Sequence, residues 1–469
     1  MARVWVLPSL LFVVGCATPP PLPASAPIER GTAAWGDCRK GEGLPMADGR
    51  VLRGDNGFAE YLPENDTSWV RRLQMIESAT RKIRVQYFIL EPDAYGKALL
   101  GALLVKQRAG VQVSLMVDAV GSPALSKPLL GKDYLEELAS AGAEVHIFAP
   151  LFATLRPRLF GSNHDKLVIV DDCLVLTGGR NVGRRYFDAP SVDPKVYADA
   201  DILVEGAKLA SWANGAYRAE AELARNRRVR PEVANRKSRA PELLAAYATA
   251  LATAKRHPAW RKDWRPRHAG LIRIFDGESR FHSPQIRDAS FATEDLIRGA
   301  KRGVVISNPY VVLSADMLDA FRAAAKRGIP ITLLTNSPLS TDSLPTQAVF
   351  QREWPSLLRE IPTLRIFASK GPAKLHAKSM VIDDDVAVVG SYNLDSLSDR
   401  INSELFVAVE SKPLAREIST HIKRQIRDNT VEYRLVEGRA VGAEQLDAAK
   451  EIRRIRWLED AAQIFRDKL

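Results

Sequence analysis

The stretch HDKLVIVD at residues 164–171, followed by GGRN at 178–181, recurs in this chain as HAKSMVID at 376–383, followed by GSYN at 390–393. Both copies fit the pattern H-x-K-x4-D-x6-G-[GS]-x-N with the same spacing throughout. A lone His followed shortly by Lys is usually surface decoration, but a long gapped pattern that occurs twice is very unlikely to be chance. The repeated stretch therefore predicts a duplicated unit.

Each copy is predicted to form a strand, a tight turn and a second strand. The residues after each Lys are apolar and partly β-branched, which favours a buried strand. Because alternate residues of a strand share a face, His164 and Lys166 should point the same way, and so should His376 and Lys378. The first strand of each copy should end at an aspartate, Asp171 or Asp383.

The two motifs resemble those of the phospholipase D superfamily, in which two HKD motifs meet in one active site. The resemblance covers roughly residues 60–225 and 270–430. It implies a set of six catalytic residues, three from each motif: His164, Lys166, Asp171, His376, Lys378 and Asp383.

The paired histidines suit cleavage of a phosphodiester. One imidazole can attack phosphorus and form a covalent phosphohistidine, while the other protonates the departing alkoxide and then deprotonates the incoming hydroxyl. By analogy with the family, His164 is expected to be the nucleophile and His376 the acid. The two lysines, together with the amides of Asn181 and Asn393, can hold the non-bridging oxygens as charge builds on them.

A carboxylate on the far nitrogen of each His would fix its tautomer and stabilise the imidazolium. In the family, this acid lies some twenty residues after the motif. The sequence NSEL at 402–405 matches the family's N-x-E element, so Glu404 is assigned to this role. In the first half, DADI at 199–202 occupies the matching place, and Asp201 is assigned, although Asp199 lies on the same strand face.

The similarity between the halves extends beyond the motifs. Residues 82–90 parallel 303–311, and residues 102–116 parallel 321–334, each pair reading as strands joined by a helix. Strands that alternate with helices imply βαβ units. The predicted fold is α/β, with two pseudo-twofold-related phospholipase D-type α/β/α halves, mixed sheets and one shared active site.

Together with the N-terminal features described below, these observations predict six segments along the chain. They are a lipoprotein signal peptide at 1–15, a Pro-rich tether at 16–40, a first half at 41–225, a basic connector at 226–269, a second half at 270–440 and a helical tail at 441–469. The tail contains RRIRWL at 453–458, which could lie on a headgroup surface or belong to an ordinary amphipathic closing helix.

Further stretches resemble the cardiolipin synthase-like branch of the superfamily. They are VQYFI at 85–89, TNS at 335–337 and GSYNLD at 390–395. That branch transfers a phosphatidyl group from one phospholipid to a hydroxyl of another. Apolar residues at 151–155 and 159–160 could admit acyl chains or form a core-packing loop.

Two alternatives stay open. HDK at 164–166, preceded by GSN at 161–163, is similar to the nuclease branch, so a secreted nuclease or phosphodiesterase is the first alternative. The second is a non-catalytic lipid-binding lipoprotein, against which the intact motifs argue.

Charge and composition favour anionic partners. The formal net charge is +11 and the pI is about 9.5, which suits phospholipid substrates, a membrane surface or, under the nuclease alternative, nucleic acid. The three cysteines are scattered and each H-x-K offers one ligand, so neither a metal site nor another cofactor is expected.

The N-terminus resembles a bacterial lipoprotein signal peptide. Arg3 precedes an apolar stretch that ends in VVGC at 13–16, so Cys16 should be lipidated. The mature chain would then lie in the bacterial cell envelope, held by acyl chains and a Pro-rich tether. Export would also leave Cys38 and Cys173 in an oxidising compartment. Whether they pair stays open, because Cys173 is expected to be buried in the first motif.

Overall fold

The computed structural model describes residues 38–39, 54–126, 132–148, 161–223, 226–231, 237–261, 264–277, 288–464 and 466. The predicted signal peptide, Cys16 and nearly all of the tether lie outside these residues, as does the whole of the apolar segment at 151–160.

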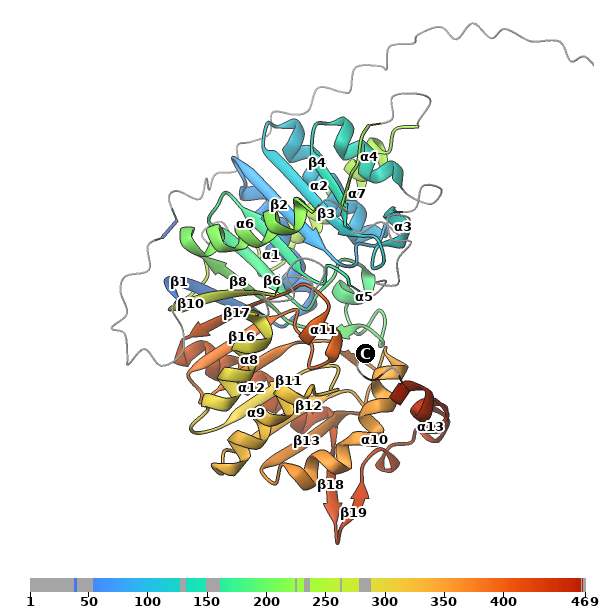
Figure 1. The fold of residues 1–469 in the computed structure, drawn as a ribbon. Helices are drawn as coiled ribbons and strands as arrows, with labels where there is room; N and C mark the ends of the chain where they lie inside the picture. The colour runs from blue at the N-terminus through green and yellow to red at the C-terminus, as the bar shows by residue number, and fades with distance from the viewer. Residues whose placement is uncertain are drawn as a thin grey trace, which may run out of the picture.

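One mixed sheet of 17 strands runs through both halves of the protein (Figure 1). From its outer edge to the centre, the first half contributes β9 (Arg227–Arg228), β4 (Glu144–Phe148), β3 (Gln112–Asp118), β2 (Lys82–Tyr87), β5 (Lys166–Val170), β6 (Leu174–Gly178), β8 (Asp201–Glu205) and β1 (Asp55–Leu62). The second half repeats this order with β18 (Thr430–Val436), β13 (Leu364–Ser369), β12 (Ile331–Thr335), β11 (Val304–Ser307), β15 (Ser379–Ile382), β16 (Val386–Gly390), β17 (Glu404–Glu410) and β10 (His268–Gly277). At the far edge, β19 (Arg439–Val441) pairs with β18.

The halves join where β1 pairs with β10 in antiparallel fashion, with Gly57 opposite Gly270. The strand order is the same on both sides of this pair, which gives the two halves a pseudo-twofold relation. The predicted fold of two mixed-sheet halves is confirmed. The structure adds that their sheets are continuous through β1 and β10.

Each motif forms the predicted hairpin. All residues of β5 and β6 are buried, as are all residues of β15 and β16, because helices cover both faces of the sheet. The hairpin turns use Asp171 and Asp172, and Asp383 and Asp384, whose φ values lie between 51° and 56°. Aspartate tolerates this left-handed conformation better than most residues, which explains why the strands end there.

Helices cover the sheet on two faces. On one face, α6 (Ala207–Ala221) and α12 (Lys412–Asn429) pack into a core that residues of both halves share. The other face has a separate core in each half. In the first half it is covered by α1 (Asn65–Ser78), α2 (Ala94–Arg108), α4 (Lys132–Ser140) and α7 (Ala240–Arg256), and in the second by α8 (Asp288–Gly299), α9 (Ala315–Lys326) and α10 (Leu344–Glu360).

The segment predicted as a connector instead completes the first half. Its strand β9 pairs with β4, and its helix α7 packs on α2. A Cβ at Gly101 of α2 would lie 2.2 Å from the Leu243 carbonyl oxygen of α7, so this glycine permits the close approach of the two helices. The separate connector is therefore a wrong prediction for the described part of 226–269.

The helical tail forms α13 (Ala449–Ile464), which packs against α10. The remaining elements are short: α3 (Pro123–Ser126), α5 (Arg184–Phe187), α11 (Ser396–Arg400), the 3-10 turn η2 (Ala443–Gln445), and the two-residue strands β7 (Tyr197–Ala198) and β14 (Lys374–Leu375). Within the described ranges, no helix combines the length and apolar character that crossing a bilayer requires.

Candidate active site

The two motif histidines lie at the junction of the halves because each is held by a loop of the other half. The backbone N–H of His164 donates to the carbonyl oxygen of Ser403 at 3.2 Å, and that of His376 donates to Ala198 at 2.9 Å. Strands β7 and β14, one from each half, pair next to His376. The predicted meeting of the motifs therefore occurs, and the backbone itself fixes it.

The orienting carboxylates cross between the halves. His164 Nδ1, from the first half, lies 2.9 and 3.0 Å from the two carboxylate oxygens of Glu404, which begins β17 of the second half. Ser391 and Ser398 donate their hydroxyls to Glu404 at 2.6 and 2.5 Å. Both oxygens of Glu404 are thus held, and Glu404 in turn fixes the Nδ1 side of the His164 ring.

In the second half, His376 Nδ1 lies 2.6 Å from Asp199 Oδ2. Asp199 precedes β8 of the first half, so this contact also crosses the junction. A Cβ at Gly179 would lie 2.1 Å from Asp199 Oδ1, which explains why the first motif has glycine where the second has Ser391. Asp199, and not Asp201, is therefore the partner of His376.

The prediction of Asp201 as the orienting acid is wrong. Asp201 Oδ2 lies 3.0 Å from both Arg72 and Arg180, and it accepts the Ser68 hydroxyl at 2.6 Å. The side chains of Asp201 and both arginines are completely buried. Asp201 thus forms ion pairs with two buried cations in the core of the first half, which is a structural role.

Strand register explains this error. Gly178 lies opposite Asp201, whereas the matching Gly390 lies opposite Phe406. The true counterpart of Glu404 is therefore two residues before Asp201. Since residues two apart share a strand face, the sequence pattern alone could not separate the two aspartates.

The motif lysines lie beside the histidines. Lys166 Nζ donates to the carbonyl oxygen of His164 at 2.5 Å, and Lys378 Nζ donates to that of His376 at 2.6 Å. The Lys378 ammonium also lies within 3.1 Å of His376 Nε2. Burial lowers the pKa of Lys378, and it lowers the pKa of Lys166 to about 7 against the raising effect of Glu404. A bound phosphate anion would favour the charged form of both lysines.

Burial also favours neutral histidines. It lowers the pKa of His164 well below its usual value, and the Lys166 and Lys378 charges lower it further. Burial lowers the pKa of His376 as well, but there Asp199 acts in the opposite direction. Burial raises the pKa of Glu404 to about 7. Although burial would raise the pKa of Asp199 too, the charge of His376 and its hydrogen bond hold it below the usual range.

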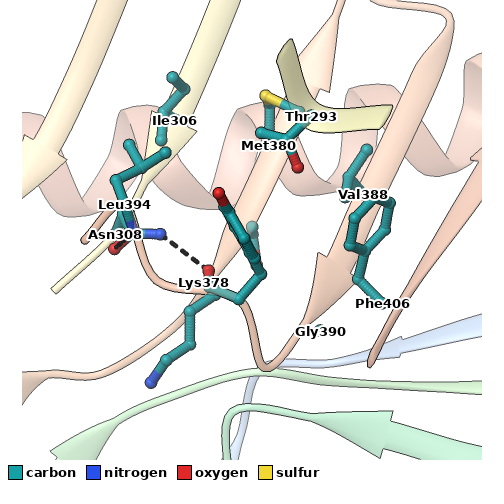
Figure 2. Close-up of a pocket in the computed structure, with 11 residues that line it drawn as sticks. Thr293, Ile306, Asn308, Lys378, Met380, Val388, Gly390, Leu394 and Phe406 are labelled. Atoms are coloured by element: carbon teal, nitrogen blue, oxygen red, sulfur yellow. Dashed lines mark hydrogen bonds between the residues drawn. The ribbon is translucent and has the colours of Figure 1, made fainter. Parts of the chain in front are cut away.

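An apolar cavity begins at the stem of Lys378 (Figure 2). The cavity is small, with a volume of about 30 Å³. Figure 2 shows the Lys378 ammonium directed away from the apolar lining of the cavity. The lining comes from the second-half core and includes Ile306, Met380, Val388, Leu394 and Phe406.

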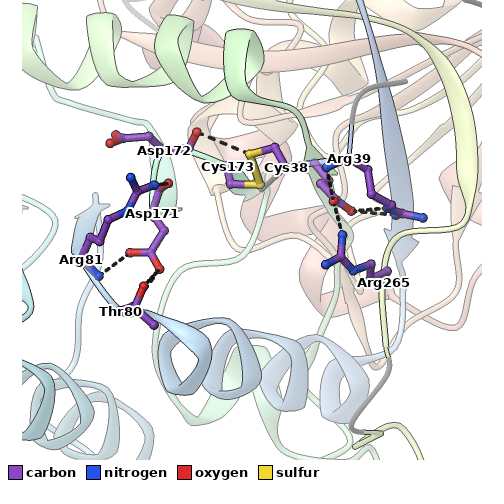
Figure 3. Close-up of a disulfide and its surroundings, with 9 residues drawn as sticks. Cys38, Arg39, Thr80, Arg81, Asp171, Asp172, Cys173 and Arg265 are labelled. Carbon is purple, nitrogen blue, oxygen red and sulfur yellow. Dashed lines mark hydrogen bonds and ion pairs between the residues drawn. A yellow bond between two sulfur atoms is a disulfide. The ribbon is translucent and has the colours of Figure 1, made fainter. Parts of the chain in front are cut away.

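Asp171 and Asp383 do not take part in the site, so their prediction as catalytic residues is wrong. Both lie at the hairpin turns, at the far end of the strand that begins beside each His. The Asp171 carboxylate accepts backbone N–H groups of Thr80, Arg81 and Lys82 at 2.7–2.9 Å (Figure 3). Asp383 accepts those of residues 301–303 in the same way. Each aspartate ties its hairpin to the residues that lead into the neighbouring strand of the sheet, β2 or β11.

The motif asparagines lie close to the junction. Asn181 Oδ1 accepts the backbone N–H of Ile89 at 3.0 Å, and its Nδ2 donates to the Tyr186 hydroxyl at 2.9 Å. The backbone N–H of Asn393 donates to Ser398 Oγ at 3.2 Å. A direct role of the two amides in holding phosphate stays a prediction.

Aromatic side chains that were not predicted to belong to the site surround the histidines. The Phe88 ring lies 5.1 Å from that of His164, and the Tyr197, Tyr186 and Tyr310 rings lie 5.0, 5.6 and 6.4 Å from that of His376. Tyr186 lies in α5 and Tyr197 in β7, eleven residues apart, and the sequence pattern did not place either beside His376. Their rings exclude water from His376 on several sides.

Across the part of the chain that the structure describes, no three His, Cys, Asp or Glu side chains form a group that could hold a metal ion. The arrangement instead offers two imidazoles, two ammoniums and two carboxylates. These groups suffice for acid–base and nucleophilic chemistry on a phosphodiester.

Comparisons with known proteins agree with this geometry. The family model described as "Cardiolipin synthase, PLD-like domain" matches residues 73–213 and 294–426. The major cardiolipin synthase ClsA of Bacillus subtilis is 28% identical over 388 residues, which cover 82% of this chain and 71% of that protein. A cardiolipin synthase A of Pseudomonas putida is 30% identical over 350 residues, covering 73% of this chain and 63% of that protein.

A solved structure shares the fold. The phosphatidylserine synthase of Haemophilus influenzae Rd KW20 superposes with a TM-score of 0.64 at 16% identity, covering 88% of this chain and 95% of that one. At this identity the likeness concerns the fold alone. The family model, in contrast, matches most of both halves and includes both motifs. The chain therefore belongs to the cardiolipin synthase family of phospholipase D-like enzymes.

Proposed function

We propose that the protein is a phosphatidyltransferase that moves a phosphatidyl group from one phospholipid to a hydroxyl of another, as a cardiolipin synthase does. The observation that carries this proposal is the crossed pairing of His164 with Glu404 and of His376 with Asp199. Each carboxylate holds the Nδ1 of one imidazole, which leaves the Nε2 atoms for the phosphodiester once Lys378, whose Nζ lies 3.1 Å from His376 Nε2, turns to the phosphate oxygens.

The proposed reaction has two steps. In the first, His164 Nε2 attacks phosphorus, the bond from phosphorus to the headgroup oxygen breaks, and His376 donates its proton to that oxygen. In the second, His376 takes the proton of an acceptor hydroxyl, whose oxygen attacks phosphorus and releases His164. With a glycerol-containing headgroup as acceptor the product is a cardiolipin; with water it is phosphatidic acid.

The environments of the two histidines support this division of roles. A nucleophile must be neutral, and the pKa of His164 is lowered by burial and by both motif lysines. The acid must carry a proton. Burial and the Lys378 charge lower the pKa of His376, and the ionised Asp199 opposes them through its charge and its hydrogen bond. Lys166 and Lys378 stand next to the histidines, where negative charge would build in the transition state.

Turnover by the purified protein tests this proposal. We expect protein supplied with phosphatidylglycerol in mixed micelles to form cardiolipin and some phosphatidic acid, both detected by mass spectrometry. Activity should survive a strong chelator, since the lysine ammoniums take the place that a metal ion has in other phosphodiesterases. The His164→Ala variant serves as the inactive control. Degradation of DNA without lipid turnover would favour the nuclease alternative, and no turnover of either would favour a non-catalytic lipoprotein.

We also propose that the protein is anchored in the bacterial envelope through lipidated Cys16. The disulfide between Cys38 and Cys173, with Cα atoms 5.5 Å apart, supports an oxidising compartment (Figure 3). Next to it, the Arg39 guanidinium lies 2.7 Å from the buried carboxylate of Glu205, which Arg265 also contacts at 2.8 Å. These contacts fix the end of the tether to the first half.

Replacing the lipidated cysteine tests the anchor. We expect Cys16→Ser to release the exported protein from the membrane pellet, because the acyl chains are lost. Turnover of bilayer lipids should fall, whereas hydrolysis of a soluble phosphodiester should persist, since the site lies far along the chain from the tether. Membrane attachment that survives Cys16→Ser at high salt would contradict the lipoprotein assignment.

A further inference from the structure

Helix α13 carries a stripe of cationic and apolar side chains that face away from the protein. Lys450, Arg453, Arg454, Trp457 and Ile464 are all exposed, and their spacing of three, four and seven residues places them on one helix face. Trp457 and Ile464 are 82% and 80% exposed, the highest values for large apolar side chains among the described residues. We call these five residues the α13 stripe.

The opposite face of α13 is fixed by packing. Ile455 and Ala462 are buried against Val312, Ala348 and Val349. The position of the stripe is therefore set by the fold, and its exposed apolar residues cannot turn inward without loss of this packing. Acidic residues also lie near the stripe: Asp460, whose carboxylate is 2.8 Å from Arg352, and, at the N-terminal end, the exposed Asp447 and the half-buried Glu451.

The helix is also attached to the rim of the active site. Beyond its C-terminal end, Arg466 donates to the carbonyl oxygen of Leu313 at 2.9 Å. Val312 and Leu313 directly follow the segment of Tyr310, whose ring lies 6.4 Å from that of His376. In Figure 1, α13 lies on the same side of the molecule as α5, which carries Tyr186.

We propose that the α13 stripe docks on the surface of a bilayer that contains anionic phospholipids. Single exposed apolar residues are ordinary, but a helix face that combines cations with tryptophan and a large aliphatic residue is typical of helices that lie in the membrane interface. The cations complement the negative headgroups, and Trp457 suits the headgroup level. This inference deepens the proposed function, since it names the surface that brings the site to its phospholipid.

Vesicle binding tests the proposal. The parent protein is the full chain with Cys16→Ser, so that the lipid anchor does not mask weaker contacts. Its binding is measured by sedimentation with vesicles of phosphatidylglycerol or of phosphatidylcholine. We expect Arg453→Gln with Arg454→Gln to weaken binding to phosphatidylglycerol about five-fold for each charge, and to reduce its salt dependence. Trp457→Ala with Ile464→Ala should weaken it by about ten-fold or more, because their apolar surface no longer leaves water.

A matched control removes two exposed cations elsewhere. Arg416→Gln with Lys423→Gln on α12 lowers the net charge equally but leaves the stripe intact, so binding should stay close to that of the parent. An equal loss in this control would show that net charge alone attracts the protein, and would overturn the docking surface. Stripe variants that bind phosphatidylglycerol vesicles as strongly as the parent does would also overturn the docking surface. Thermal melts check folding, and the single Trp457→Gln variant decides the question if a double variant unfolds.

A soluble short-chain phosphatidylglycerol separates this inference from the proposed function. We expect every stripe variant to turn it over at the parental rate, because none of the five residues contacts the histidines. If the stripe variants turn over the soluble lipid normally and also bind vesicles as the parent does, the docking surface is wrong and the enzyme function stands. If the parent shows no turnover but its binding to vesicles still depends on the stripe, the proposed enzyme function is wrong and the docking surface stands.

Discussion

Replacing either His164 or His376 by alanine is expected to remove nearly all phosphatidyl transfer, by roughly 10³-fold or more, with little loss of stability. The two imidazoles act on one phosphodiester, so the double variant should be hardly worse than either single one. Turnover of phosphatidylglycerol, compared at equal folded concentration, measures the effect. His257→Ala is a suitable control, because His257 pairs with Asp66 at the surface.

A substrate with a good leaving group distinguishes the two roles. A nitrophenyl phosphodiester does not need a proton on its departing oxygen, so the first step should survive in His376→Ala but not in His164→Ala. Because His376 is also the base of the second step, His376→Ala should accumulate the covalent phosphohistidine, which intact-protein mass spectrometry detects. Near-wild-type transfer by either single variant would contradict the shared site, and an adduct on His376 would reverse the assigned roles.

The aspartates Asp199 and Asp201 are expected to fail in different ways. Asp199→Asn should leave the fold intact but lower turnover by roughly 10³–10⁴-fold, because the amide no longer fixes the proton on His376 Nδ1. Asp201→Asn should lower the free energy of unfolding by about 3–5 kcal/mol, because Arg72 and Arg180 remain charged and completely buried.

Urea denaturation and turnover measured on the same preparations test this contrast. Glu404→Gln is the matched variant in the second half and should resemble Asp199→Asn, since Glu404 holds His164 as Asp199 holds His376. A folded but inactive Asp201→Asn, together with a fully active Asp199→Asn, would restore Asp201 as the orienting acid and contradict the hydrogen bonds described above.

The sequence determined the family, the fold class and the central chemical groups of the site. The spacing shared by the two motifs predicts a duplicated unit. The apolar runs after Lys166 and Lys378 predict buried hairpins, and the alternation of a strand places each lysine on the face of its histidine. These features are local, because each depends on residues a few positions apart and on the period of a strand.

Only the tertiary structure decided which groups meet. Asp199 and Asp201 have the same residue type and share a strand face, so the pairing of β6 with β8 separates the orienting acid from the buried ion pair. Asp171 recurs at its motif position just as His164 does, but it lies at the far end of the strand, in the hairpin turn, where it accepts backbone N–H groups. Each histidine takes its carboxylate from the opposite half. Such contacts join residues far apart in the chain, and their geometry is set by strand register and by the β1–β10 junction, which no local pattern records.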